Sequence, residues 1–159
     1  MNNWRIGNGY DVHRLAPGLP LRIGGVQVEH DRGAVAHSDG DAAIHALCDA
    51  LLGAAGLRDI GFHFPDTFAE FKGIDSKILL RKTVALVAEK GYTIGNVDLT
   101  VCLQRPRLKP LIPQMRAVLA ETMGVDPDRV NVKATTTEQL GFVGREEGVA
   151  AYAVAMIRK

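Results

Sequence analysis

The sequence lacks several features that would indicate a function directly. It has only two cysteines among 159 residues, Cys48 and Cys102. They are far apart and each lies among apolar residues, so buried free thiols are favoured over a disulfide or a thiolate metal site. There is no P-loop, no dinucleotide-binding glycine motif and no nucleophile elbow. An enzyme with this sequence would therefore depend on metals and on the positioning of its substrate, as in much phosphoryl transfer.

Strong net charge and long apolar runs are also missing. The 19 basic and 18 acidic residues give a net charge of +1, which argues against a nucleic-acid partner. Since no apolar run approaches 18 residues, no membrane span is expected. The first residues resemble neither a signal peptide nor a transit peptide, so a cytoplasmic location is expected. The length suits one domain, residues 1–159, with a substantial core.

The hydrophobic pattern predicts strands that alternate with helices. Ser38 or Asp39 is the expected cap of the first helix, and Asp75 that of the second. We expect an α/β (α+β) fold in which about four strands form a mixed sheet, with the helices on one face and a short hairpin beside it. The expected strands are 4–15, 93–104, 129–137 and 149–157, the hairpin is 21–30, the helices are 38–56, 75–92 and 110–124, and the loops are 59–73 and 138–148.

Three side chains from two elements indicate a metal site. Asp11 and His13 lie two apart in a strand, so they point to the same face. His45 shares one face of a helix with Asp41 and Asp49, at spacings of four residues. Two histidines and a carboxylate with one open position are typical of catalytic zinc, and a neighbouring carboxylate often fixes the histidine tautomer. The alternative is a polar stripe that simply faces water.

The segment "HSDGD", residues 37–41, precedes this helix and suggests an anion site. The free N–H groups at a helix N-terminus attract anions, and His37 and Ser38 could add side-chain donors. The alternative is ordinary helix capping.

A second candidate phosphate site is "KATTTEQLGFVGREEG", residues 133–148. Thr135, Thr136 and Thr137 offer hydroxyl and N–H groups, and Glu138 offers an oxygen for a hard cation such as magnesium. Arg145 is a candidate for a phosphate contact or an ion pair. A strand end rich in threonine is the alternative, because threonine favours strands.

Together these motifs resemble those of the 2-C-methyl-D-erythritol 2,4-cyclodiphosphate synthases of non-mevalonate isoprenoid biosynthesis. The resemblance runs nearly end to end. It is carried by "GYDVHRL", "IGGV", "AHSDGDAAIHALCDALLGAAGLRDIG", "FPDT", "KGIDS", "GYTIGNVDLTV", "IPQMR" and "NVKATTTEQLGFVGREEG". It implies that the 2-phosphate of 4-diphosphocytidyl-2-C-methyl-D-erythritol 2-phosphate attacks the β-phosphorus of the same molecule and expels CMP. The substrate would then bring the nucleophile that the protein lacks.

The resemblance also implies roles for individual residues. Asp11, His13 and His45 would bind Zn²⁺, and Glu138 would reach toward a second divalent cation, Mg²⁺ or Mn²⁺. His37 and Thr136 would be the catalytic residues. The substrate would be contacted by Asp11, His13, His37, Ser38, Asp59, Ile60, Gly61, Phe64, Pro65, Asp66, Thr67, Phe68, Leu103, Gln104, Arg105, Pro106, Arg107, Leu108, Lys109, Thr135, Thr136, Thr137, Glu138, Phe142 and Arg145.

The resemblance further implies a homotrimer whose active sites lie between subunits. Arg145 would face a mostly apolar central cavity that could accept an isoprenoid diphosphate. Two other functions stay open at this point. One is a metal-dependent phosphohydrolase, and the other is an oligomeric binding module braced by zinc, in which Cys48 could supply a fourth ligand because it lies three residues after His45.

Overall fold

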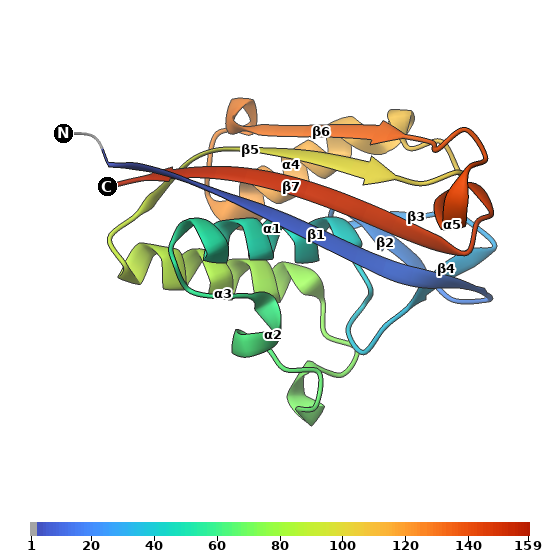
Figure 1. Ribbon diagram of the computed structural model, residues 1–159, viewed down its shortest axis with the longest axis horizontal. Helices are drawn as coiled ribbons and strands as arrows, with labels where there is room; N and C mark the ends of the chain where they lie inside the picture. The colour runs from blue at the N-terminus through green and yellow to red at the C-terminus, as the bar shows by residue number, and fades with distance from the viewer. Residues whose placement is uncertain (1–2) are drawn as a thin grey trace.

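The computed structural model describes residues 3–159, which form one mixed sheet with helices packed on one of its faces (Figure 1). The strand order is β4-β1-β7-β5-β6, and only β5 and β6 are parallel. Helix α1 packs against β1 and β7, α4 packs against β6, and α3 packs against α1 and α4. The predicted mixed sheet and the predicted layer of helices are confirmed.

The elements have the following bounds. The sheet contains β1 (Trp4–Pro17), β4 (Arg32–Val35), β5 (Thr93–Cys102), β6 (Val130–Thr135) and β7 (Gly148–Arg158), and β2 (Leu21–Ile23) pairs with β3 (Val26–Val28) in a separate hairpin. The α-helices are α1 (Ala42–Ala54), α2 (Ile60–His63), α3 (Ser76–Glu89), α4 (Ile112–Met123) and α5 (Gly141–Gly144). Short 3₁₀ turns cover Ala69–Phe71, Lys109–Leu111 and Pro127–Arg129.

The prediction of about four strands was wrong, because the main sheet has five. The missed strand is β4, which is four residues long and pairs with residues 14–17 of β1. A strand this short shows too little alternation to be recognised. The two predicted loops also contain helical turns, since α2 lies within 59–73 and α5 within 138–148.

The first helix begins later than predicted, because its N-cap is Asp41 rather than Ser38 or Asp39. The fully buried Asp41 carboxylate accepts from the backbone N–H of Ile44 at 3.0 Å. It also accepts from the N–H groups of Gly24 and Gly25 at 2.9 and 2.7 Å, at the turn of the β2–β3 hairpin. One carboxylate therefore fixes the hairpin to the start of α1. The predicted cap of the second helix, Asp75, is confirmed.

Two glycines of β1 allow α1 to lie directly on the strand. A Cβ atom at Gly7 would lie 2.1 Å from the carbonyl oxygen of Ala50, and one at Gly9 would lie 1.8 Å from that of Ala46. Both distances are far below any van der Waals contact, so only glycine fits. These glycines therefore bring the backbones of β1 and α1 together one turn from His45.

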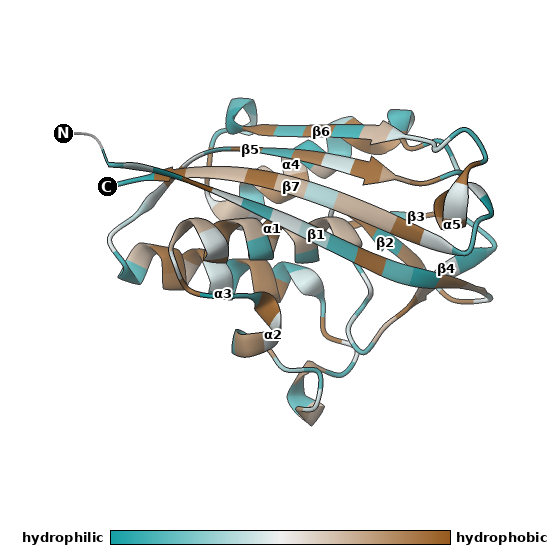
Figure 2. Cartoon of the chain, in the orientation of Figure 1, coloured by the Kyte–Doolittle hydropathy of each residue, from teal (hydrophilic) through white to brown (hydrophobic). Residues whose placement is uncertain are grey.

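The two faces of the sheet differ in their surroundings. Apolar and polar residues alternate along β5 (Figure 2), with the apolar ones buried, as expected for a strand with one buried face. The outer face nevertheless exposes large apolar side chains on β1 and β7, which are Trp4, Ile6, Tyr10, Val12, Tyr152 and Val154. Such a patch marks a surface that another molecule can cover.

Within residues 3–159, no helix has the length and apolar character needed to cross a lipid bilayer.

Replacing Gly9 with alanine is expected to lower the free energy of unfolding by at least about 2 kcal/mol, since the new methyl group meets backbone that cannot move aside. Gly53→Ala is the matched control. Gly53 is a helical glycine of α1 whose Cβ would meet nothing within 4 Å, so alanine should raise stability by about 0.5–1 kcal/mol. Urea denaturation measures both changes, and equal stability of the two variants would contradict this account.

Candidate active site

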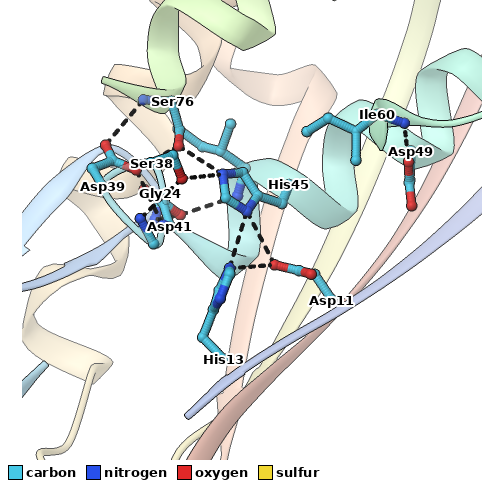
Figure 3. A network of polar contacts seen from close by, with 12 residues as sticks. Asp11, His13, Gly24, Ser38, Asp39, Asp41, His45, Asp49, Ile60 and Ser76 are labelled. Carbon is cyan, nitrogen blue, oxygen red and sulfur yellow. Dashed lines mark hydrogen bonds and ion pairs between the residues drawn. The ribbon is translucent and has the colours of Figure 1, made fainter. Parts of the chain in front are cut away.

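Asp11, His13 and His45 form a compact group of possible metal ligands (Figure 3). His13 Nε2 lies 2.9 Å and His45 Nδ1 lies 3.1 Å from Asp11 Oδ2, and the two ring nitrogens are 3.1 Å apart. The alternation of β1 places Asp11 and His13 on the face that meets α1, and the glycine contact brings His45 onto them. Sequence spacing in the strand and packing of the helix therefore combine to build the group.

The donor set fits a zinc ion that keeps one position open. Two imidazole nitrogens and one carboxylate oxygen are the ligand types of catalytic zinc sites, which leave the fourth position to water or substrate. In the described part of the chain, no cysteine belongs to this group of ligand atoms. Cys48 is fully buried, and burial raises the pKa of its thiol to about 12. Both cysteines are free thiols, as predicted, but Cys102 is only partly buried rather than buried.

The charges of the group depend on one another. Burial alone would raise the pKa of Asp11, but hydrogen bonds from His13 and His45 outweigh it and lower that pKa to about 2. Burial alone would lower the pKa of His45, and its hydrogen bond to Asp11 outweighs this, so the pKa is raised above its ordinary value. Without a metal, Asp11 thus favours the protonated imidazole of His45, which carries a hydrogen on both ring nitrogens.

The other two acidic residues of the predicted α1 stripe do not reach the metal group. Asp41 accepts from the hairpin turn and the helix start, and Asp49 accepts from the backbone N–H of Ile60 at 2.7 Å. Asp49 therefore holds the start of α2 against α1 (Figure 3). Ile60, Gly61 and Phe64 to Asp66 line a cavity together with His13 and His45. The expectation that a carboxylate on this stripe orients the imidazole of His45 was wrong.

A cavity of about 300 Å³ opens beside His13 and His45. Its lining consists of His13, Ala36, His37, Ser38, His45, Ile60, Gly61, Phe64, Pro65, Asp66, Phe71, Ile74 and Leu79. The polar side chains of His13, His37, Ser38 and His45 share this lining with aromatic and aliphatic side chains. Such a cavity suits a ligand with one phosphate-bearing end and one carbon-rich end.

A second cavity, of about 390 Å³, lies at the ends of β5 and β6. It is lined by Leu103, Gln104, Pro106, Arg107, Leu108, Lys109, Ile112, Ala134, Thr135 and Thr136. The two cavities share no lining residue. The residues predicted to contact substrate thus fall into two groups within one chain.

The remaining predicted residues lie around these cavities. Asp59 caps α2 by accepting from Phe62 N–H, and Phe68 contributes a carbonyl oxygen 3.1 Å from His37 Nε2. Thr67 is exposed on the same segment. Sequence reasoning missed Ala36, Phe71, Ile74 and Leu79 of the first cavity and Ile112 and Ala134 of the second. These apolar residues carry no chemical signal of their own.

The loops beside the second cavity are joined by polar contacts. Arg105 makes a two-pronged ion pair with Glu146, at 2.8 and 3.2 Å. The backbone N–H of Gln139 donates to the side-chain oxygen of Gln104 at 3.2 Å. Glu138 is exposed in a left-handed conformation (φ 51°).

Three further predicted residues lie near these loops. The Thr137 hydroxyl donates to the carbonyl of Leu140 at 2.7 Å. The exposed Arg145 pairs with Glu147 at 2.9 Å, and Phe142 lines a small cavity together with His13.

The comparisons with known proteins agree with this geometry. The model of the YgbB family matches residues 4–158. The chain belongs to the YgbB family. A curated relative from Bacteroides fragilis, named 2-C-methyl-D-erythritol 2,4-cyclodiphosphate synthase, is 59% identical over 155 residues, which cover 98% of each chain. The resemblance that the motifs indicated is therefore confirmed.

Solved structures show the same fold. The bifunctional IspDF of Campylobacter jejuni matches with a TM-score of 0.96 and 44% identity over 99% of this chain, which spans 43% of that longer chain. A 2C-methyl-D-erythritol-2,4-cyclodiphosphate synthase described as a CDP-bound form matches with a TM-score of 0.89 and 41% identity, over 96% of this chain and 99% of the other.

The raised pKa of His45 predicts that metal binding releases a proton near neutral pH, because only the neutral imidazole is a ligand. Zinc affinity should therefore fall as the pH drops from about 7.5 toward 6. Calorimetric titration of metal-free protein with zinc, in buffers of equal pH but different ionisation enthalpy, measures the release. A heat of binding that does not depend on the buffer would contradict it.

Proposed function

We propose that this chain converts 4-diphosphocytidyl-2-C-methyl-D-erythritol 2-phosphate to 2-C-methyl-D-erythritol 2,4-cyclodiphosphate and CMP, in isoprenoid biosynthesis. The observation that carries the proposal is a three-ligand metal group beside a cavity, in a chain 59% identical over 155 residues to a curated synthase. The whole chain, residues 1–159, acts as one synthase domain in the cytoplasm.

The reaction needs a site that positions two anionic groups of one molecule. An oxygen of the 2-phosphate forms a bond to the β-phosphorus, the bond from that phosphorus to the bridging oxygen breaks, and this oxygen leaves with CMP. No protein nucleophile is required, which agrees with the sequence. Holding the two groups in line supplies much of the rate enhancement.

The metal group and its cavity receive the methylerythritol end. Asp11, His13 and His45 would hold Zn²⁺, which when bound supplies positive charge and an open position for a phosphate oxygen. His37 and Ser38 contact phosphate from the cavity rim. Asp59 to Gly61 and Phe64 to Phe68 enclose the carbon chain.

The second cavity receives the cytidine diphosphate end. Residues 103–109 and 135–138 surround the nucleotide, and the exposed Glu138 would hold a second divalent ion, Mg²⁺ or Mn²⁺, which would supply positive charge for the diphosphate. Thr136 stabilises the transition state at the β-phosphorus. The relative described as a CDP-bound form supports a cytidine nucleotide as a ligand of this fold.

We place each complete active site between two copies of a homotrimer. Two observations support this arrangement. The two cavities share no lining residue, and the outer face of the sheet exposes apolar side chains of β1 and β7. Phe142 lines a small cavity with Val12 of that face, and Arg145 pairs with Glu147 of the same cavity, so we place an isoprenoid diphosphate there within the trimer.

Phosphorus NMR of the protein with the cytidyl substrate and magnesium tests the reaction. A cyclic diphosphate should appear together with CMP, and a strong zinc chelator should stop its formation. A linear phosphate product would instead indicate a phosphohydrolase. No product from protein that keeps its zinc would indicate a binding module.

Replacing His45 with alanine should remove zinc and turnover together, because one of three ligands is lost. We expect turnover to fall by more than about 100-fold, since even the partners of metal ligands typically contribute 10–100-fold. Metal analysis and the NMR assay measure both. Full activity of this variant in chelated buffer would show that the ligand assignment is wrong.

Replacing Glu138 with glutamine should raise the magnesium concentration needed for half-maximal turnover by about 10-fold, while zinc content stays unchanged. Glu121→Gln, at an exposed carboxylate on α4, is the control and should leave the magnesium titration unchanged. Identical titration curves for the Glu138→Gln variant and the unmodified protein would contradict the role of Glu138.

A further inference from the structure

Ser76 is a buried hydroxyl residue next to the metal group that the sequence did not single out. It is the first residue of α3, its exposed fraction is 0%, and its hydroxyl oxygen lies 2.9 Å from His45 Nε2. This is the ring nitrogen on the side opposite Asp11 and His13 (Figure 3). Ser76 therefore contacts the imidazole of a metal ligand without being a ligand itself.

The hydroxyl proton of Ser76 is committed to Asp39. Ser76 Oγ donates to Asp39 Oδ1 at 2.5 Å, and the Ser76 backbone N–H donates to Asp39 Oδ2 at 3.0 Å. Asp39 Oδ1 also accepts from the backbone N–H of Asp41 at 3.1 Å, and the Asp39 N–H donates to the carbonyl of Ile74. The carboxylate of Asp39 is thus held by donors from Ser76 at the start of α3 and from Asp41 at the start of α1.

This arrangement determines which nitrogen of His45 carries the proton. A hydroxyl has one proton, and that of Ser76 is used toward Asp39, so toward His45 it can only accept. His45 Nε2 must then carry a hydrogen, and once the ring is neutral this leaves Nδ1 with a free lone pair pointing at Asp11 and His13. The second hydroxyl near Nε2 is that of Ser38, at 3.2 Å, and it also accepts from Gly40 N–H at 3.2 Å.

We propose that Ser76 and Asp39 are positioning residues for the metal site, which fix the tautomer and orientation of His45 so that Nδ1 is presented to the metal. Asp39 orients the hydroxyl of Ser76, and the hydroxyl orients the ring. Since Ser76 holds Nε2 at the shorter distance, Ser38 can turn to a substrate phosphate without releasing the ring. The proposal rests on the proposed function, because it assumes that a metal binds this group.

The test is zinc affinity, measured by competition with a chromophoric chelator. Ser76→Ala should weaken zinc binding by about 10–100-fold, the usual effect of removing the partner of a metal-bound histidine. Ser76→Thr keeps the hydroxyl and should stay within a few-fold of the unmodified protein. Thr83→Ala is the matched control, because it removes a buried hydroxyl from the same helix and should leave affinity unchanged.

Asp39→Asn provides a second variant of nearly equal shape. The amide group can donate toward Ser76, which frees the serine proton for His45 Nε2 and favours the wrong tautomer. Nitrogen–proton correlation NMR of metal-free protein is recorded at a pH high enough that the His45 ring is neutral. It should show the hydrogen of His45 on Nε2 in the unmodified protein, and a shift toward Nδ1 in this variant. A role limited to folding stability would not move the tautomer.

The outcomes separate this inference from the proposed function. Weakened zinc binding in Ser76→Ala, with retention in Ser76→Thr and Thr83→Ala, supports it. Unchanged affinity in Ser76→Ala, or a hydrogen on Nδ1 in the unmodified protein, overturns it while the metal site stands. If the unmodified protein binds no zinc, the metal site and the positioning role are both wrong.

Discussion

The contact between β1 and α1 is the constraint on which the rest of the structure depends. Gly7 and Gly9 let the helix backbone lie directly on the strand, where a single methyl group would overlap a carbonyl oxygen. This contact carries His45 to within 3.1 Å of groups that lie more than 30 residues earlier in the chain. If β1 and α1 were farther apart by the width of a side chain, His45 would lie too far from Asp11 and His13 for the three residues to bind one ion.

Acidic side chains around the start of α1 brace the site rather than bind the metal. Asp41 joins the hairpin turn to the helix, Asp49 holds the 60–66 segment, and Asp39 secures Ser76. Each carboxylate accepts from backbone N–H groups that would otherwise be unsatisfied near the cavity. The metal ligands therefore sit within a network whose elements come from four parts of the chain.

The sequence was informative wherever a local pattern decides the structure. The alternation of apolar and polar residues predicted the long strands. The helical periodicity between Asp75 and Gly91 predicted α3. The two-residue spacing of Asp11 and His13 predicted that both point to the same face of β1. It failed where tertiary contacts decide. Strand β4 forms because it pairs with β1. Asp41 caps α1 because it also accepts hydrogen bonds from the hairpin turn. Ser76 reaches His45 only when α3 packs against α1. The resemblance, more than the spacing, indicated the substrate.

X-ray absorption spectroscopy at the zinc edge tests the central claim most directly, because it reports the atoms around the metal in zinc-loaded protein. The account predicts two imidazole nitrogens, one carboxylate oxygen and one further light atom, all at about 2.0–2.2 Å. A sulfur neighbour at about 2.3 Å would contradict it, since Cys48 would then close the site and leave no position for a phosphate oxygen.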